Sequence, residues 1–483
     1  MVASLEARKT EGDKDRIVEL DRLGSGPPSV TPYHLDTRSR QVDLLLGANR
    51  DDRWIANFYG SWFGDNGVGP GGLQALTREE SNVDGKQYLL DLQYNNRELF
   101  ADWAFTVRAY YLHQYLDIYN QLLPSAYLNM IGEPFGEGND GGIEANGTYS
   151  GFAQHQLRFA LGTRYYDTET DEIKNFGPGV PVQFGAPVSV KGTPYIFMDN
   201  QHRFLWYVSL QDEWSLAKGW AVTAGIRYDE YDDFGETVNP RLALVWETRY
   251  DLTTKLLYGR AFRAPSFSEL YYQANPVIQG NPGLDPETIE TYEVALDWQP
   301  TAGLRIIPSF YYYDIDDAIE FVGPLPSRAE NFASIDGKGF EVEATWHVVD
   351  SLILSANLAY QRSKNKNTDE IVPDTPTWQF YAEADWDFLP HWSLNGQYFW
   401  IGDRRRASGD PRPEIEDYDL VNLTLRKTDI ANHWDAALAV RNLFDADVRE
   451  PSPYDPSAPG GAFIPGDYPM EGRSFWVELR CHF

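Results

Sequence analysis

The sequence predicts an all-β protein, a transmembrane antiparallel up-and-down β-barrel of about 20 strands. Apolar and polar residues alternate in runs of about ten along the chain, as in strands with one face toward lipid and one toward a lumen. The connections between these runs are alternately short and long, as in outer-membrane barrels with short periplasmic turns and long outer loops. Aromatic residues make up 14% of the chain, and membrane interfaces are rich in them.

The composition excludes several other classes of protein. The chain has no run of about 18 apolar residues, which a membrane helix needs. Its formal net charge is −31, whereas binding to nucleic-acid phosphates requires clustered Lys and Arg. Cys481 is the only cysteine, and the eight histidines show no paired metal-ligand spacing. We therefore predict no nucleic-acid partner, no metal site and no cofactor.

The final strand of the barrel is predicted at the C-terminal end of the chain. Phe475, Val477, Leu479, Cys481 and Phe483 alternate with Ser, Trp, Glu, Arg and His. This period of two places the first set on one face of a strand. We expect that face to contact lipid, with Phe483 closing it. The same alternation recurs in residues 204–210, 220–226 and 378–386.

The connections predict the orientation of the strands. Short turns are expected near residues 50–52, 96–98, 152–154, 216–219, 248–252, 300–302, 349–350, 388–390 and 428–432. Long outer loops are expected at 10–39, 63–85, 118–141, 167–199, 263–285, 318–336, 365–375, 405–415 and 445–470, and the connection 232–237 is tight. Both chain ends then lie on the periplasmic side, and the strand number is even, as in bacterial single-chain barrels.

A set of motifs in residues 200–483 resembles TonB-dependent outer-membrane receptors. They include the segments 258–265, 280–287, 337–343 and 440–445, and a final strand that ends in Phe. The residues that carry the resemblance are Arg260, Phe262, Arg263, Pro265, Asn281, Pro282, Leu284, Pro286, Glu287, Asn442, Phe444 and Phe483. Proline ends strands and shapes turns, so we favour a scaffold role for these residues over contact with a ligand.

The resemblance implies a 22-strand barrel filled by a plug that contacts TonB in the periplasm. Here no plug-like sequence and no signal peptide precede the strands, and about two strands are lacking. We therefore expect residues 1–483 to be one barrel domain whose plug and first hairpin are missing. Contact with the TonB system would need that plug.

The resemblance also implies a function and partners. We expect an outer-membrane transporter of a Gram-negative bacterium that takes up a scarce nutrient as a metal chelate, most simply a ferric siderophore. Membrane lipid, lipopolysaccharide and the outer-membrane assembly machinery are the other expected partners. A plugless passive pore is an alternative. An outer-membrane enzyme is a remote one, because the sequence shows no nucleophile elbow, phosphate loop or dinucleotide fingerprint.

Two groups of residues are candidates for ligand contact. Arg404, Arg405 and Arg406 lie where a strand enters a long outer loop. Guanidinium groups suit carboxylate or catecholate oxygens, and lipopolysaccharide phosphate is an equally good partner. Tyr111 and Tyr115 near His113 could receive a flat ligand at the rim. An aromatic girdle at the membrane interface explains the same residues without any ligand.

Overall fold

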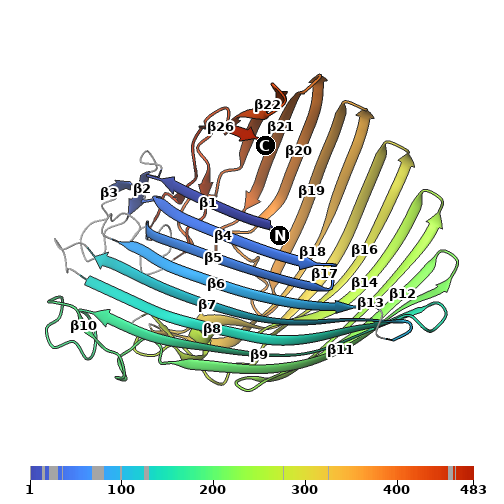
Figure 1. Ribbon diagram of the computed structural model, residues 1–483. Coiled ribbons are helices and arrows are strands. Elements are labelled where there is room, and N and C mark those ends of the chain that lie inside the picture. Colours follow the sequence, from blue (N-terminus) through green and yellow to red (C-terminus); the bar gives the residue numbers. More distant parts are fainter. Residues whose placement is uncertain are drawn as a thin grey trace.

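In the computed structural model, one large and almost entirely antiparallel sheet curves into a barrel (Figure 1). The structure describes residues 2–12, 17–20, 31–34, 36–67, 81–97, 100–123, 130–275, 277–324, 326–454, 461–462 and 464–482. Phe483, which was expected to close the lipid face, lies outside these residues. Among the described residues, no helix is long and apolar enough to cross a membrane.

The sheet contains 22 strands, of which 20 are long and two have only two residues. The long strands are β1 (Val2–Thr10), β4 (Ser39–Arg50), β5 (Trp54–Asn66), β6 (Asn82–Asn96), β7 (Trp103–Leu123), β8 (Met130–Tyr149), β9 (His155–Lys174), β11 (Gln201–Ala217), β12 (Trp220–Tyr231), β13 (Gly235–Arg249), β14 (Leu252–Arg263), β16 (Glu287–Thr301), β17 (Leu304–Val322), β18 (Ser327–Val349), β19 (Leu352–Asn365), β20 (Pro376–Leu389), β21 (Trp392–Arg404), β22 (Tyr418–Ile430), β23 (Trp434–Arg441) and β26 (Ser474–Cys481). The predicted fold class and strand number are confirmed.

The remaining elements lie in the long connections. They are β2 (Ile17–Leu20), β3 (Thr31–His34), β10 (Val188–Ser189), α1 (Phe267–Tyr271), β15 (Ile278–Gln279), β24 (Arg449–Glu450) and β25 (Tyr468–Pro469). The two-residue strands β10 and β15 pair with β9 and β18 and thereby attach two outer loops to the barrel wall.

The strand register separates an apolar outer face from a polar inner face. Near the short turns the outer face carries a row of tryptophans, namely Trp54, Trp103, Trp214, Trp220, Trp246, Trp298, Trp346, Trp386, Trp392 and Trp434. A second aromatic row lies toward the long loops and includes Tyr88, Tyr111, Tyr165, Trp206, Tyr228, Tyr258, Tyr292, Tyr312, Tyr360 and Trp378. Two such girdles bound the apolar band of a membrane barrel.

The short turns lie where the sequence predicts them, but two predicted long loops are mostly strand. In place of a loop at 318–336, β17 extends to Val322 and β18 begins at Ser327, with Val322 opposite Arg328. In place of a loop at 118–141, β7 extends to Leu123 and β8 begins at Met130. Pairing continues beyond the membrane because it satisfies backbone N–H and C=O groups that would otherwise need other partners.

Candidate functional site

Three arginines line the inner wall of β7, β9 and β12, and each is held by a carboxylate. Arg164 Nε and Nη2 donate to Asp140 Oδ1 and Oδ2 at 2.7 and 2.5 Å. Arg108 Nε donates to Asp91 Oδ2 at 2.6 Å. Arg227 Nη2 donates to Asp229 Oδ1 at 2.6 Å. We call Arg108, Arg164 and Arg227 the inner-wall arginine row.

The carboxylates of this row are part of the wall, whereas the guanidinium groups face the lumen. The Asp140 side chain is only 5% exposed, and its partner Arg164 is 46% exposed. The other two pairs show the same difference. A buried carboxylate fixes the position and orientation of its guanidinium group, and the half-exposed N–H groups remain able to donate.

Aromatic rings support the row from the same face of the wall. The guanidinium carbon of Arg227 lies 3.6 Å from the ring centroid of Tyr207, and that of Arg108 lies 5.4 Å from the ring of Tyr110. Tyr207 in turn donates a short hydrogen bond to Glu144. The row therefore combines planar donors, aromatic surface and local charge balance, a combination suited to an anionic ligand that carries aromatic groups.

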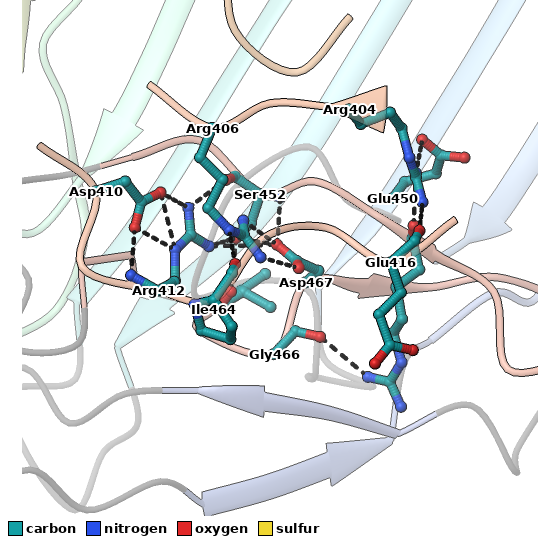
Figure 2. A network of polar contacts seen from close by, with 12 residues as sticks. Arg404, Arg406, Asp410, Arg412, Glu416, Glu450, Ser452, Ile464, Gly466 and Asp467 are labelled. Carbon is teal, nitrogen blue, oxygen red and sulfur yellow. Dashed lines mark hydrogen bonds and ion pairs between the residues drawn. The ribbon is translucent and has the colours of Figure 1, made fainter. Parts of the chain in front are cut away.

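The predicted ligand-contact residues Arg404 and Arg406 form hydrogen bonds with other parts of the outer loops (Figure 2). Arg404 is 2% exposed and donates to the carbonyl oxygens of Arg449 and Glu416 at 2.8 and 2.6 Å. Arg406 Nη1 and Nη2 donate to the two carboxylate oxygens of Asp467 at 3.0 and 2.6 Å. Their donors thus join the loop after β21 to the loop between β23 and β26.

Asp467 is the centre of this loop network (Figure 2). It also accepts a hydrogen bond from Arg412 Nη1 at 3.3 Å and one from the backbone N–H of Ser452 at 3.0 Å. Burial opposes ionisation of Asp467, but the hydrogen bonds from Arg406 and Ser452 outweigh it and hold the pKa of this carboxyl below its usual value.

Arg405 differs from its two neighbours because its side chain is 55% exposed. Its Nε lies 3.2 Å from Asp403 Oδ1. Arg405 also lines a cavity of about 240 Å³ between the outer ends of β19 and β20. Of the three predicted arginines, Arg405 is therefore the one placed to reach a ligand.

A protein-family model described as "TonB dependent receptor-like, beta-barrel" matches residues 29–443. The chain belongs to the TonB-dependent receptor β-barrel family. It is 26% identical over 321 residues to the ferric enterobactin receptor of Pseudomonas aeruginosa, a match that covers 56% of this chain and 42% of that receptor. The chain thus spans less than half the length of this relative.

Solved structures show the same fold. A crystal structure of a mutant ferric enterobactin receptor from Pseudomonas aeruginosa matches with a TM-score of 0.74 and 18% identity, over 96% of this chain and 72% of that one. The copper transporter OprC matches with a TM-score of 0.75 and 14% identity, over 100% of this chain and 76% of that one. As a TonB-dependent receptor barrel, the chain is an outer-membrane protein.

The family-motif residues of the loop 264–286 contact one another and two neighbouring loops. Arg263 donates to Glu287 at 2.6 and 2.7 Å and to Glu269 at 2.9 and 3.0 Å. Ser266 and Glu269 form a capping box at the start of α1. Arg203 donates to the carbonyl oxygen of Pro265 at 2.8 Å and to Asp233 at 2.7 Å. The motif therefore connects three outer loops of the receptor barrel.

The other motif residues lie at the outer end of the barrel. Leu284 is buried against Leu270 and Ala329, and Asn281 Nδ2 donates to the carbonyl oxygen of Ala329 at 3.0 Å. Pro282 and Pro286 flank Leu284 in the same loop. In the adjoining strands, Arg260 lies opposite Glu290, Phe262 contacts the ring of Tyr231, and Glu287 accepts a hydrogen bond from the Ile319 N–H. After β23, Asn442 is buried beside Ala446, whereas Phe444 is exposed.

Tyr111, His113 and Tyr115 lie on the outer face of β7. Their side chains alternate with that of Tyr110, which faces the lumen beside Arg108. Tyr111 donates to Asn139 Oδ1 at 2.7 Å, and His113 Nδ1 lies 3.1 Å from the same oxygen. These residues form part of the outer aromatic girdle and point away from a ligand in the lumen.

The sequence contains a signal for the inner-wall arginine row. Arg108 and Tyr110, Arg164 and Tyr166, and Arg227 and Asp229 are each two residues apart. Residues at this spacing share one face of a strand. Their carboxylate partners Asp91 and Asp140 lie on neighbouring strands, so the complete pairs become visible only once the register is known.

Proposed function

We propose that this chain is the translocation barrel of a TonB-dependent receptor that takes up a ferric siderophore. The inner-wall arginine row is the observation that supports the proposal most directly. Ferric siderophores present carboxylate, hydroxamate or catecholate oxygens, and guanidinium groups bind such oxygens through two parallel hydrogen bonds. Arg405 at the outer end of β21 is a candidate for an earlier contact with the same chelate.

Binding of a ferric catecholate to the purified chain in detergent tests this proposal. Replacing Arg108, Arg164 and Arg227 together by Gln removes the donors but keeps most of the side-chain volume. Each lost charge-assisted hydrogen bond costs about 1.5 kcal/mol, so we expect the dissociation constant, measured by fluorescence quenching, to rise at least about tenfold.

Arg305→Gln is the matched control. Arg305 also faces the lumen and pairs with Asp297 at 2.6 Å, but it lies beside the short turn between β16 and β17. The control should bind the chelate like the parent chain. Equal affinity in the parent and the triple variant would refute a role of the row in chelate binding.

We also propose that a plug and a further hairpin complete the receptor. The outward apolar residues of β1 and β26 support the hairpin, because Leu5 and Val477 are 72% and 75% exposed, more than the other large apolar side chains of the described barrel strands. A barrel of this size without a plug should conduct ions in a planar bilayer. Conductance that disappears when a plug is supplied would support the receptor, and nutrient passage without one would support a passive pore.

A further inference from the structure

A pocket of about 350 Å³ lies on the lumen side of β7, β8 and β9, farther outward than the inner-wall arginine row. Gly138 is two residues from Asp140 and therefore faces the lumen, as does Gly136. Each glycine is the centre of a cross-strand row, and the two rows are Leu116–Gly136–Thr170 and Gln114–Gly138–Thr168. The wall thus lacks side chains at the middle of both rows. We call this site the glycine-floored pocket.

Two outer loops form the roof of the glycine-floored pocket. Ile196, Phe197 and Met198 come from the loop between β9 and β11, and Tyr272 directly follows α1 in the loop 264–286. The backbone N–H of Gln273 donates to the carbonyl oxygen of Phe197 at 2.7 Å. The two loops are therefore connected to each other above the pocket.

A buried ion pair of β9 positions this roof. The side chains of Glu172 and Lys174 are 2% and 1% exposed, and Glu172 Oε1 lies 3.2 Å from Lys174 Nζ. Lys174 Nζ donates to the carbonyl oxygen of Tyr195 at 2.6 Å, and Glu172 Oε2 accepts a hydrogen bond from the Phe197 N–H at 2.8 Å. The loop is thus attached to the wall on both sides of Ile196. A preformed pocket of this kind loses little free energy through ordering when a ligand binds.

The lining of the glycine-floored pocket suits an uncharged apolar group. Its large apolar and aromatic residues include Leu116, Ile118, Tyr166, Ile196, Phe197 and Tyr272. None of the described residues that line it is a Lys or Arg, and the carboxylate of Glu172 lies at its edge. An anion in the pocket would gain no cationic partner. Aromatic rings stack favourably with other rings, so an aryl group fits this lining best.

The pocket adjoins the inner-wall arginine row at Tyr166. This residue lines the pocket, and the guanidinium carbon of Arg164 lies 6.0 Å from its ring centroid. Arg164 and Thr168 share the lumen face of β9 and are four residues apart, which corresponds to about 13 Å along a strand. One ligand can therefore place oxygen atoms at Arg164 and an apolar group beside Thr168.

We propose that the glycine-floored pocket binds an uncharged aryl group of the chelate whose oxygen atoms bind the inner-wall arginine row. This inference rests on the proposed function and specifies its substrate class. The aryl group occupies the space above Gly136 and Gly138, between the ring of Tyr166 and that of Tyr272. The receptor thereby distinguishes chelates with an aryl substituent from chelates that carry only small aliphatic groups.

Two ferric complexes with the same iron-binding group test the proposal. Ferric tris(benzohydroxamate) carries phenyl groups, and ferric tris(acetohydroxamate) carries methyl groups at the same positions. Binding of each complex to the full chain in detergent is measured by fluorescence quenching, with detergent alone as the blank. Because the pocket buries one phenyl group, the dissociation constant of the phenyl complex should be about 30-fold lower than that of the methyl complex.

Gly138→Leu should remove this preference, because the new side chain occupies the pocket. A Cβ atom at Gly138 would lie 3.6 Å from Tyr166 Oη and 3.9 Å from the carbonyl oxygen of Asp167, which are ordinary contact distances. The wall can therefore accept a side chain here, and Gly138→Ala should reduce the preference in part. Gly141→Leu is the matched control. Gly141 lies on the same strand opposite the outward-facing Tyr111, so this variant should keep the full preference.

Retention of the folded form in unheated electrophoresis identifies the folded variants. The proposal is overturned if the parent chain binds both complexes equally, if folded Gly138→Leu and Gly138→Ala keep the full preference, or if Gly141→Leu loses it. The triple Gln variant of the inner-wall arginine row separates this proposal from the proposed function. It should weaken both complexes by the same factor and keep the phenyl preference. Unchanged affinity of the triple variant for both complexes would refute the role of the row and leave the pocket as an independent aryl site.

Discussion

The inner-wall arginine row differs from two cations on the outer face of the barrel, Lys338 of β18 and Arg362 of β19, which lie opposite each other in the strand register. Each arginine of the row has its own carboxylate within the wall, so the charge is balanced and the guanidinium group is held in place. Lys338 and Arg362 face each other, and neither forms an ion pair with a carboxylate of the described residues. On the lumen side each charge is therefore balanced by one fixed carboxylate, whereas on the outer face no single carboxylate holds either cation.

In an ion pair of this barrel, the exposure of the arginine side chain should decide how much the partner carboxylate contributes to the free energy of unfolding. A half-exposed guanidinium group that loses its partner is solvated by lumen water, whereas a buried one is left as an uncompensated charge. The loop network around Asp467 contains the most buried arginines of this comparison, because the side chains of Arg406 and Arg412 are only 8% and 4% exposed. Three sites of this barrel therefore form a series from buried and paired to exposed and unpaired.

The largest effect is expected for Asp467→Asn in the loop network. This change leaves the buried Arg406 without its carboxylate partner, whereas Arg412 keeps its ion pair with Asp410 at 2.6 Å. It should destabilise the folded loops by about 3 kcal/mol. Amide hydrogen exchange of residues 449–454 should become faster in the variant. Asp447→Asn is the control, because this carboxylate pairs with Arg449 at the surface and should contribute less than about 1 kcal/mol. Equal exchange in both variants would contradict the role of burial.

The same network should depend on pH. The pKa of Asp467 is lower in the folded loops than in an unfolded chain, so its ionisation stabilises the folded form. This contribution is fully present above the unfolded pKa of about 4 and is lost as the pH falls through the lower folded value. The protection factors of the amides of residues 449–454, which correct for the intrinsic slowing of exchange in acid, should therefore fall below about pH 4. A fall that begins instead near pH 6 would point to histidine.

A smaller effect is expected for Asp140→Asn in the inner wall. Arg164 loses its charged partner, but lumen water solvates the half-exposed guanidinium group. We expect the free energy of unfolding in urea to fall by about 1 kcal/mol. Asp369→Asn, which removes a surface partner of Lys364, should change it by less than about 0.5 kcal/mol. A loss at Asp140 as large as that at Asp467 would break the proposed series.

The fold could be predicted because its determinants are local. Alternation with period two identifies strands and their faces, and the contrast between short turns and long loops orients them. The predicted loop boundaries are wrong where strands extend beyond the membrane, as at Val322 and Ser327. Outside the bilayer there is no lipid face to maintain, so the alternation that marks a strand is no longer required.

The candidate site could be predicted only in part, because its contacts join distant segments. Arg404, Arg405 and Arg406 are the same residue type, yet two of them donate to carbonyl or carboxylate groups that lie 7 to 61 residues away. The partner of Arg108 lies 17 residues away on a neighbouring strand. Such pairings depend on the register and on loop packing, which single-sequence patterns do not contain.

The smallest effect, and the only one of opposite sign, is expected for Lys338→Glu. The variant places a carboxylate in place of a cation opposite Arg362, so the free energy of unfolding in detergent should rise by about 0.5 kcal/mol. Lys364→Glu is the mirror-image control, because it would place two carboxylates opposite each other at Asp336 and lower stability by a similar amount. Urea titrations of both variants measure the difference. A loss of stability in Lys338→Glu would show that the pair is already compensated within the protein.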